Sequence, residues 1–373
     1  MMYKKILCLF FLINNISLFA QNDNSEQIIV NQHESISTII PQIQNLANKL
    51  LVGHTGSIVA INPANGQVIC LATNSRTGQN IDLAIGKAYA PGSTFKVAQA
   101  LTLATEGIIS KNTIIPCRGK YYNGNLRVGC HKHPTPLNLP FALAYSCNTW
   151  FLKSFLAMIS NKMIYGSYDT AIDTWYSYIK SMGFGGPTGI DIAGEKGGLI
   201  ANSTYLKHRY KGNWTPKTII WAGIGQGDIT ATPLQLCVFA CSVANRGFFF
   251  LPHTKTKYEE KILQERYNTR HETKIPTNIY IPIIRGMRYA VKYGTAKSLS
   301  NKQYSKFYIC GKTGTVENEG KDHSVFIGFA PMNRPKIAIA VFIEHGGFGA
   351  NLAAPIAGHI MKEYIKCNKK NNK

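Results

Sequence analysis

The chain has 373 residues, enough for one large domain or two ordinary ones, and its 45% hydrophobic and 16% charged residues are typical of a folded protein with a sizeable core. Its 41 Lys and Arg against 19 Asp and Glu give a formal net charge of +22, which favours anionic surroundings such as nucleic acid, a membrane surface or an acidic wall polymer. The sequence has no nucleic-acid-binding motif and its Lys residues are not interleaved with aromatic residues, so we exclude a nucleic-acid partner. A codon bias towards Lys and Asn would explain the charge without any anionic partner.

The N-terminus has the pattern of an export signal. Lys4 and Lys5 precede the apolar stretch 6–20, which is too short to span a bilayer comfortably, and Ala20 suits cleavage before the polar residues that follow. We therefore predict a signal peptide over 1–20, with an uncleaved membrane anchor as the alternative. The protein is expected to be exported and to work in the periplasm, either soluble or attached to the cytoplasmic membrane.

The domain organisation that follows is simple. Residues 21–45 are rich in Gln and Asn and are predicted to be a linker into a short helix that ends near Leu51. Residues 46–373 are predicted to form a single folded domain. No segment after the N-terminal stretch looks transmembrane.

Two hairpins and a fifth strand are predicted at the two ends of this domain. In each hairpin, two apolar runs flank a short segment whose Pro, Asn and Gly residues suit a turn. The predicted strands are 57–61, 67–72, 307–310, 324–330 and 336–343, and the third of them runs into Gly311 and Lys312.

Helical patterns fill the region between the hairpins. Residues 95–106 are apolar nearly all round and stop at Gly107, as expected of a buried helix, and Ser93 lies at the start of that helix. Further helices are predicted over 139–160, 234–246 and 353–366. The predicted fold class is α+β, with a five-stranded antiparallel sheet flanked by helices and a large, mostly helical subdomain inserted between the strands of the two chain ends.

Three short motifs carry the chemistry. S-x-x-K is Ser93–Lys96, S-x-N is Ser146–Asn148 and K-T-G is Lys312–Gly314. Each motif alone is weak, because its residue types are common. All three in this order, with the first at a helix start and the last at a strand, are typical of serine acyl-transfer enzymes that act on penicillin and peptidoglycan stem peptides.

The first two motifs supply a nucleophile and proton carriers. Ser93 is a poor nucleophile until a base takes its proton, and Lys96 lies one helical turn away on the same face. Lys96 can act as that base only if its pKa falls, through burial or through a neighbouring cation such as Lys312. Ser146 can relay a proton to the leaving group, and the amide of Asn148 can orient the substrate.

The third motif supplies binding groups. Lys312 and Thr313 can clamp a substrate carboxylate, and Gly314 lacks a side chain, so an extended peptide can lie along its strand. An oxyanion hole needs two fixed N–H groups, and we expect them to come from the backbone of Ser93 and Thr315.

Over residues 45–365 the chain resembles the transpeptidase domain of penicillin-binding proteins, most of all the monofunctional class B type that serves cell elongation. The resemblance is carried by Tyr89–Lys96 (YAPGSTFK), Gly223–Gly227 (GIGQG), Thr232–Gln235 (TPLQ), Gly311–Thr315 (GKTGT), Gly328–Pro331 (GFAP) and Ala353–Pro355 (AAP).

This resemblance implies a peptidoglycan D,D-transpeptidase that needs no cofactor for catalysis. Ser93 would attack the penultimate D-Ala of a stem peptide, release the terminal D-Ala and pass the acyl group to an amine of a neighbouring stem, and β-lactams would acylate the same serine. The implied roles are base for Lys96, proton relay and orienter for Ser146 and Asn148, and carboxylate and oxyanion contacts for Lys312, Thr313 and Thr315.

The implied partners are lipid-linked or polymeric stem peptides, β-lactam antibiotics and membrane proteins of wall elongation. Class B enzymes usually carry a membrane anchor and an elongated N-terminal domain ahead of the catalytic one. Residues 21–45 leave little room for such a domain, so we do not expect partners to dock through it.

The cysteine pattern points to a structural metal. Cys130 and His133 have chelate spacing, and thiolates and imidazole are suitable Zn²⁺ ligands that close a tetrahedral site in sets of four. We predict a structural zinc site, for which relatives of the elongation type are the precedent. Its ligands would be Cys117, Cys130, His133 and Cys147, with His131 as the alternative to His133.

The position of Cys147 indicates a structural role for this metal site. Cys147 lies between Ser146 and Asn148, so it must point away from the cleft if they face it, and a metal there would brace the S-x-N loop from behind. A Cys117–Cys130 disulfide, the default for an exported chain, and buried free thiols are the alternatives.

Other activities fit the same motifs. A serine β-lactamase needs a base for deacylation, and no carboxylate motif for it lies between Ser146 and Lys312, while a D,D-carboxypeptidase, a β-lactam-binding sensor and an inactive scaffold stay open. Asp228 and Glu317 are expected to be exposed, solvated carboxylates. His323 is not expected to be catalytic, because this chemistry depends on Lys and Ser.

Overall fold

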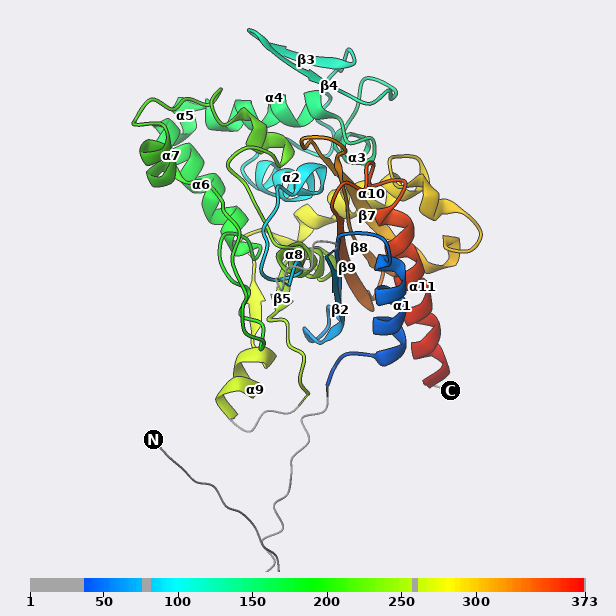
Figure 1. The fold of residues 1–373 in the computed structure, drawn as a ribbon. Helices are drawn as coiled ribbons and strands as arrows, with labels where there is room; N and C mark the ends of the chain where they lie inside the picture. Colours follow the sequence, from blue (N-terminus) through cyan, green and yellow to red (C-terminus); the bar gives the residue numbers. More distant parts are fainter. Residues whose placement is uncertain (1–36, 76–81, 257–260, 372–373) are drawn as a thin grey trace, which may run out of the picture. The chain divides into compact units, whose positions relative to one another are not determined.

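The central sheet brings the two ends of the chain together, as predicted. The computed structural model describes residues 37–75, 82–256 and 261–371, and five strands pair antiparallel in the order β2-β1-β9-β8-β7 (Figure 1). The strands are β1 (Gly56–Ile61), β2 (Val68–Asn74), β7 (Cys310–Val316), β8 (His323–Ala330) and β9 (Ile337–Ile343). Because β7 is at the edge of the sheet, its outer side can face a ligand.

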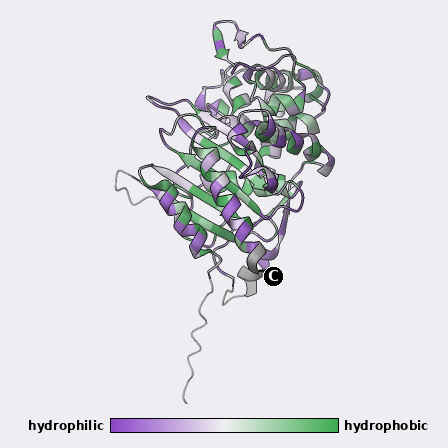
Figure 2. Ribbon diagram, turned by 90° about the vertical axis from the view of Figure 1, so that its right-hand side faces the viewer, coloured by the Kyte–Doolittle hydropathy of each residue, from purple (hydrophilic) through white to green (hydrophobic). Residues whose placement is uncertain are grey.

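Each face of the sheet packs on its own hydrophobic core, since successive side chains of a strand point to opposite faces. Along β9, Ala340 belongs to one core and Ile339 to the other. Helix α8 (Pro233–Ala244) lies on the first face, while α1 (Pro41–Leu51) and α11 (Ala353–Asn371) cover the second. In Figure 2 the strands are predominantly hydrophobic, and the helices packed on them carry hydrophilic residues on their outer side.

The remaining elements form a mostly helical subdomain with two small two-stranded sheets. One is the hairpin of β3 (Lys120–Asn123) and β4 (Leu126–Gly129), and the other pairs β5 (Phe248–Phe250) with β6 (Arg270–Glu272). Its helices are α2 (Lys96–Thr105), α3 (Leu139–Ala144), α4 (Asn148–Ile159), α5 (Lys162–Tyr165), α6 (Tyr168–Ser181), α7 (Ser203–Arg209), α9 (Lys261–Asn268) and α10 (Thr277–Lys292). Short 3₁₀ helices are η1 (Gly92–Phe95), η2 (Ile220–Ile224), η3 (Lys297–Ser300) and η4 (Ser305–Phe307).

Two predicted elements differ from those observed. The strand predicted over 307–310 begins only at Cys310, because Tyr308 has a φ of +48°, which lies outside the β region, and K-T-G therefore lies within the strand. The helix predicted over 139–160 is broken at Ser146, whose φ of +57° separates α3 from α4. The β3–β4 hairpin and α10 were not predicted.

The N-terminal boundaries are only partly visible. The predicted signal peptide over 1–20 lies outside the described residues, whereas α1 ends at Leu51 as predicted and begins at Pro41, inside the predicted linker. Among the described residues, none of the helices combines the length and apolar character needed to cross a membrane.

Candidate active site

The turn into α2 places Ser93 beside the K-T-G strand. Gly92 has a φ of +54°, and a Cβ there would lie 2.9 Å from Cγ2 of Val316 and 3.0 Å from the carbonyl oxygen of Thr315, so only glycine allows this close approach. Lys96 follows Ser93 by three residues, and its Nζ lies 3.0 Å from the Ser93 Oγ. The S-x-x-K pair is thus in hydrogen-bonding contact at the edge of the sheet.

Lys96 has no exposed surface and joins the first two motifs. Its Nζ donates to the Ser146 carbonyl oxygen at 2.9 Å and to the Ser146 Oγ at 3.2 Å, and it also donates to the Oδ1 of Asn148. Burial lowers the pKa of Lys96 from 10.5 to about 7, which the nearby thiols of Cys147 and Cys130 oppose. Burial, one of the two predicted causes, is therefore the main one.

Lys312, in the K-T-G strand, is equally buried. Its Nζ donates to the carbonyl oxygen of Thr313 at 2.9 Å. Burial, and after it the neighbouring Lys96, lowers the pKa of Lys312 well below its ordinary value.

The S-x-N loop directs the side chains of Ser146 and Asn148 towards the cleft and that of Cys147 away from it, as predicted. Cys147 is fully buried and begins α4 as its N-cap, with its Sγ accepting from the backbone N–H of Trp150 at 3.4 Å. Ser146 and Asn148, on either side of it, reach the cleft. The Nδ2 of Asn148 also donates to the carbonyl oxygen of Gly129 at 2.7 Å, which ties the loop to the β3–β4 hairpin.

A cleft of about 580 Å³ lies over these groups. Its lining includes the predicted residues Ser93, Ser146, Asn148, Thr313 and Thr315. Lys96 and Lys312 do not line it, because they are buried beneath.

Gly314 lies close to the turn that carries Ser93. A Cβ on Gly314 would lie 3.0 Å from Cγ2 of Thr94 and 3.2 Å from the carbonyl oxygen of Pro91. A glycine at this position therefore allows β7 to lie close to the turn that carries Ser93.

Several lining residues had no signal in the motifs. Thr295 follows α10 and its Oγ1 accepts from the Thr313 Oγ1 at 2.6 Å, which links this segment to K-T-G. Phe348 belongs to the loop after β9, and its ring lies 6.2 Å from the ring of His131, across the cleft. The cleft is also lined by Ile224 and Gln226 of the GIGQG string and by the predicted metal ligand Cys130. The other lining residues without a sequence signal are Gly129, Asp322, Ala350 and Asn351.

The two carboxylates considered from the sequence have different environments. Glu317 is exposed and lines the cleft. Asp228 is not the exposed carboxylate that was predicted: its side chain is only 15% exposed and accepts hydrogen bonds from the hydroxyls of Tyr205 at 3.2 Å and Tyr210 at 2.7 Å. It lines a separate cavity of about 270 Å³, behind the GIGQG segment.

The four predicted metal ligands converge behind the S-x-N loop. One ligand atom from each of Cys117, Cys130, His133 and Cys147 lies within 4.8 Å of the others. The eight cysteines among the described residues are unbonded, so the Cys117–Cys130 disulfide is absent from this structure. His131 is not part of the cluster and lines the cleft instead.

The hydrogen bonding of this cluster suits a metal ligand set. The Nδ1 of His133 contacts the carbonyl oxygen of Pro134 at 2.7 Å and must therefore carry the proton, which leaves a lone pair on Nε2. That Nε2 is buried without a hydrogen-bond partner. A hydrogen bond with Cys147 is the main cause that lowers the pKa of Cys130 to about 4, so this pair favours one thiolate even without a metal.

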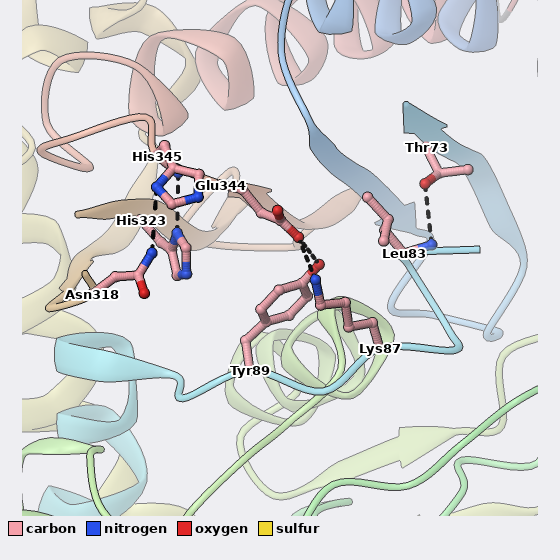
Figure 3. A network of polar contacts seen from close by, with 8 residues as sticks. All are labelled: Thr73, Leu83, Lys87, Tyr89, Asn318, His323, Glu344 and His345. Atoms are coloured by element: carbon pink, nitrogen blue, oxygen red, sulfur yellow. Dashed lines mark hydrogen bonds and ion pairs between the residues drawn. The ribbon is translucent and has the colours of Figure 1, made fainter. Parts of the chain in front are cut away.

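His323 has a structural contact at the cleft rim and no contact with Ser93 or Lys96. Figure 3 shows its Nδ1 accepting from the backbone N–H of His345 at 3.0 Å, at the start of the loop that carries Phe348. Next to it, the Oε1 of Glu344 contacts the Nζ of Lys87 at 2.8 Å and the hydroxyl of Tyr89 at 2.7 Å. Burial and the adjacent His345 lower the pKa of His323, which keeps it neutral and able to accept.

Comparison with known proteins identifies a family. Residues 56–362 match the family described as the penicillin binding protein transpeptidase domain. Peptidoglycan D,D-transpeptidase MrdA of Acinetobacter baumannii is 30% identical over 84% of this chain and 52% of its own length. The chain thus spans about half the length of the curated relatives it matches.

Solved structures have the same fold. PBP2 of Pseudomonas aeruginosa in complex with WCK 5153 has a TM-score of 0.76 at 25% identity, covering 88% of this chain and 78% of that one. PBP2 of Helicobacter pylori in complex with MreC has a TM-score of 0.72 at 22% identity, covering 89% of this chain and 63% of that one.

Proposed function

Because this chain belongs to the penicillin-binding protein transpeptidase family, we propose that it is a D,D-transpeptidase of the elongation type that cross-links peptidoglycan stem peptides and is acylated by β-lactams. The observation that carries the proposal is the contact set of Lys96, whose Nζ reaches Ser93, Ser146 and Asn148 at once. This set provides a base, a nucleophile and a relay in one buried network.

In the first half-reaction, neutral Lys96 takes the proton of Ser93 as its Oγ bonds to the carbonyl carbon of the penultimate D-Ala. The C–N bond to the terminal D-Ala then breaks, and the leaving amine receives the proton from Lys96 through the Ser146 hydroxyl. In the second half-reaction, an acceptor amine attacks the acyl ester, loses a proton to Lys96, and the Ser93 Oγ leaves and is reprotonated. Atoms and protons balance without a cofactor.

The burial of Lys96 makes this proton transfer feasible near neutral pH. At an ordinary pKa, only about one Lys in a few thousand is neutral at pH 7. With its pKa lowered to about 7, Lys96 is neutral in about half of the molecules and remains a competent acid after it has taken the proton.

The K-T-G strand is proposed to bind the donor peptide. The hydroxyls of Thr313 and Thr315 line the cleft and would bind the terminal carboxylate, with Lys312 beneath them. The backbone N–H groups of Ser93 and Thr315 are proposed as the oxyanion hole. The outer edge of β7 would pair with the extended peptide.

Hydrolysis is a second candidate outcome for the acyl-enzyme, as in a β-lactamase or a D,D-carboxypeptidase. The observation in its favour is that the carboxylates of Glu317 and Asp322 line the cleft and can activate a water. Both carboxylates follow the K-T-G motif in the chain and do not lie between Ser146 and Lys312.

The cluster of Cys117, Cys130, His133 and Cys147 is proposed to hold a structural Zn²⁺. Three thiols, an imidazole with a buried free Nε2 and the convergence of all four support it. Bound Zn²⁺ would supply no catalytic chemistry there. Because Cys147 separates Ser146 from Asn148, its anchoring would fix both side chains against Lys96.

Location and partners are proposed from the sequence and the relatives. The N-terminal pattern supports export to the periplasm, in soluble form or attached to the membrane. The complex of Helicobacter pylori PBP2 with MreC supports an MreC-like protein as a partner.

The proposal is tested by acylation of the purified protein with a fluorescent penicillin, followed by intact mass over several hours. A stable adduct in the wild type that is absent in Ser93→Ala supports the transpeptidase. Rapid loss of the adduct with turnover indicates a β-lactamase. Absence of an adduct on folded wild-type protein would overturn both enzymatic functions.

A further inference from the structure

The net charge of the chain is distributed unevenly around the cleft. The segment 107–168, which runs from the end of α2 through the S-x-N loop, contains no Asp or Glu. Its seven basic residues are Lys111, Arg118, Lys120, Arg127, Lys132, Lys153 and Lys162. The first five of these are exposed, and two of them, Lys120 and Arg127, lie in the strands of the β3–β4 hairpin. This part of the cleft rim therefore carries charge of one sign.

The strand register places the basic side chains of the hairpin on one face. Tyr122 pairs with Arg127 and Lys120 pairs with Gly129, and directly paired residues of antiparallel strands point to the same side. Tyr121, on the opposite face, is buried against the subdomain. The hairpin stands out from the body beside α4 (Figure 1), so its outer face carries Lys120, Tyr122 and Arg127 into solvent.

This outer face leads directly into the cleft. Gly129, the partner of Lys120 in the register, lines the cleft, and its carbonyl oxygen accepts the hydrogen bond from the Nδ2 of Asn148. Asn148 is the residue proposed to orient the substrate amide. A chain that leaves the reaction centre past Asn148 therefore meets the foot of the hairpin first.

The charges on this face are available to a ligand. Among the described residues, none of the ion pairs involves Lys120, Arg127 or Lys132. The guanidinium carbon of Arg127 lies 5.8 Å from the ring centroid of Tyr122, within the range of a cation–π contact. That contact orders the guanidinium while leaving its N–H groups free for a carboxylate, which Arg binds through two parallel hydrogen bonds.

We propose that the outer face of the β3–β4 hairpin is a docking site for an acidic donor peptide, holding free carboxylates that lie N-terminal to its D-Ala-D-Ala end. This inference rests on the proposed transpeptidase function. The hairpin selects donors by charge complementarity and supplies orientation, while the K-T-G strand holds the terminal carboxylate. Continuity with the cleft favours a peptide over a lipid surface, because Tyr122 is the one large exposed apolar side chain of the hairpin and membrane-binding surfaces need more.

The experiment measures acylation of the full chain by two matched synthetic peptides. Both end in D-Ala-D-thiolactate, so that the C–S bond breaks as the Ser93 ester forms and the released thiol is counted. One peptide carries a glutamate before D-Ala and the other a glutamine. We expect the wild type to prefer the glutamate peptide about three- to tenfold in kcat/KM at low salt, and to lose the preference at about 0.5 M salt.

Three variants test which residues cause the preference for the glutamate peptide. Lys120→Gln/Arg127→Gln removes it by lowering kcat/KM for the glutamate peptide to about that for the glutamine peptide. Lys120→Arg keeps it, because the charge remains. Lys302→Gln/Lys306→Gln, which removes two exposed charges that do not line the cleft, also keeps it.

Each contrary outcome overturns the inference. It is wrong if the hairpin double variant retains the preference, or if the Lys302/Lys306 control loses it equally, since net charge would then be the cause. It is also wrong if the hairpin variant loses flotation with phosphatidylglycerol vesicles while it keeps the peptide preference, because the face would then bind membrane. Penicillin labelling of Ser93 separates the two proposals: a labelled protein without the preference contradicts the docking site alone, and an unlabelled one contradicts the transpeptidase.

Discussion

Basic side chains are central both to the β3–β4 hairpin and to the layer beneath the cleft, but their environments are opposite. We call that layer the floor, and it consists of Lys96 and the side chains that Lys96 contacts. Lys96 on the floor has no exposed surface, and burial lowers its pKa to about 7, whereas Lys120 and Arg127 on the hairpin are exposed. The floor therefore holds an amine that exchanges a proton at neutral pH. The hairpin holds exposed basic side chains that can attract anions.

The comparison shows that surroundings, rather than residue type, assign these roles. A buried ammonium is unfavourable unless it loses its proton, so the hydrogen-bond acceptors around Lys96 must be held closely in place. An exposed charge is screened and weak, so several must act together. Changes on the floor should thus have large effects, changes in its support smaller ones, and changes at the rim the smallest.

The largest effect is expected on the floor, from Lys96→Arg. Arg retains the charge and much of the length of Lys but cannot be deprotonated, so the base is lost. Penicillin acylation should fall about 10²–10⁴-fold, the range that a general base contributes. In the wild type the acylation rate should rise with pH through about 7, because only neutral Lys96 accepts the proton of Ser93.

Stopped-flow acylation at several pH values tests this, with Lys302→Arg as the matched exposed control. An acylation rate in Lys96→Arg within a few-fold of the wild type would remove the distinction between floor and hairpin. A wild-type rate that is flat between pH 5.5 and 8.5 would assign the base to another group.

An intermediate effect on stability and acylation is expected from changes to the four proposed metal ligands behind the floor. Removing bound Zn²⁺ with a chelator should lower Tm by about 3–6 °C, since a ligand bound at about a hundred times its Kd adds about 3 kcal/mol to the free energy of unfolding. Acylation should slow as well, because Cys147 holds Ser146 and Asn148 against Lys96. Elemental analysis should find one Zn²⁺ per chain.

Two cysteine variants distinguish a metal from ordinary packing. Cys117→Ser should abolish both the Zn²⁺ content and the response of Tm to the chelator. Cys241→Ser, a buried cysteine of α8 outside the cluster, should lower Tm but keep both. Equal Zn²⁺ content in the two variants would show that the cluster is not the binding site.

The sequence predicted best what depends on short spacings. Ser93 and Lys96 meet because a helical turn joins them, and Cys130 and His133 converge over a similarly short span. The sequence could not decide between His131 and His133, because both lie close to Cys130 in the chain and only the folded loop places His133 in the cluster and His131 on the cleft. The sheet was also predictable, since its strands are strongly apolar.

Features that depend on long-range contacts were missed. Thr295 and Phe348 line the cleft from segments without any motif, and Asp228 is covered by two tyrosines that lie 18 and 23 residues away in the chain. The β3–β4 hairpin is short and polar, so its alternation is too weak to predict a strand. Its charge was visible in the composition, but its place at the cleft was not.

The smallest effect is expected at the opposite rim, where His323 supports the loop that carries Phe348. His323→Leu removes the acceptor of the His345 N–H, and the expected loss in acylation rate is about two- to fivefold, the value of one hydrogen bond. His323→Asn places an oxygen near the former Nδ1 and should restore most of the rate. Acid pH is a poor substitute for these variants, because Glu344, His345, Lys87 and Asp322 all face His323 and Lys96 also titrates.

Hydrogen exchange of the backbone over 344–351 provides the second readout for this rim. We expect faster exchange in His323→Leu than in the wild type or His323→Asn, with no change in α2, because the loop would be released while the floor stays packed. If exchange rises in α2 as well, the rim and the floor form one cooperative unit, and the contrast between them would hold for charge but not for stability. If the Leu variant changes neither exchange nor acylation, the contacts of Glu344 with Lys87 and Tyr89 are sufficient to hold the loop.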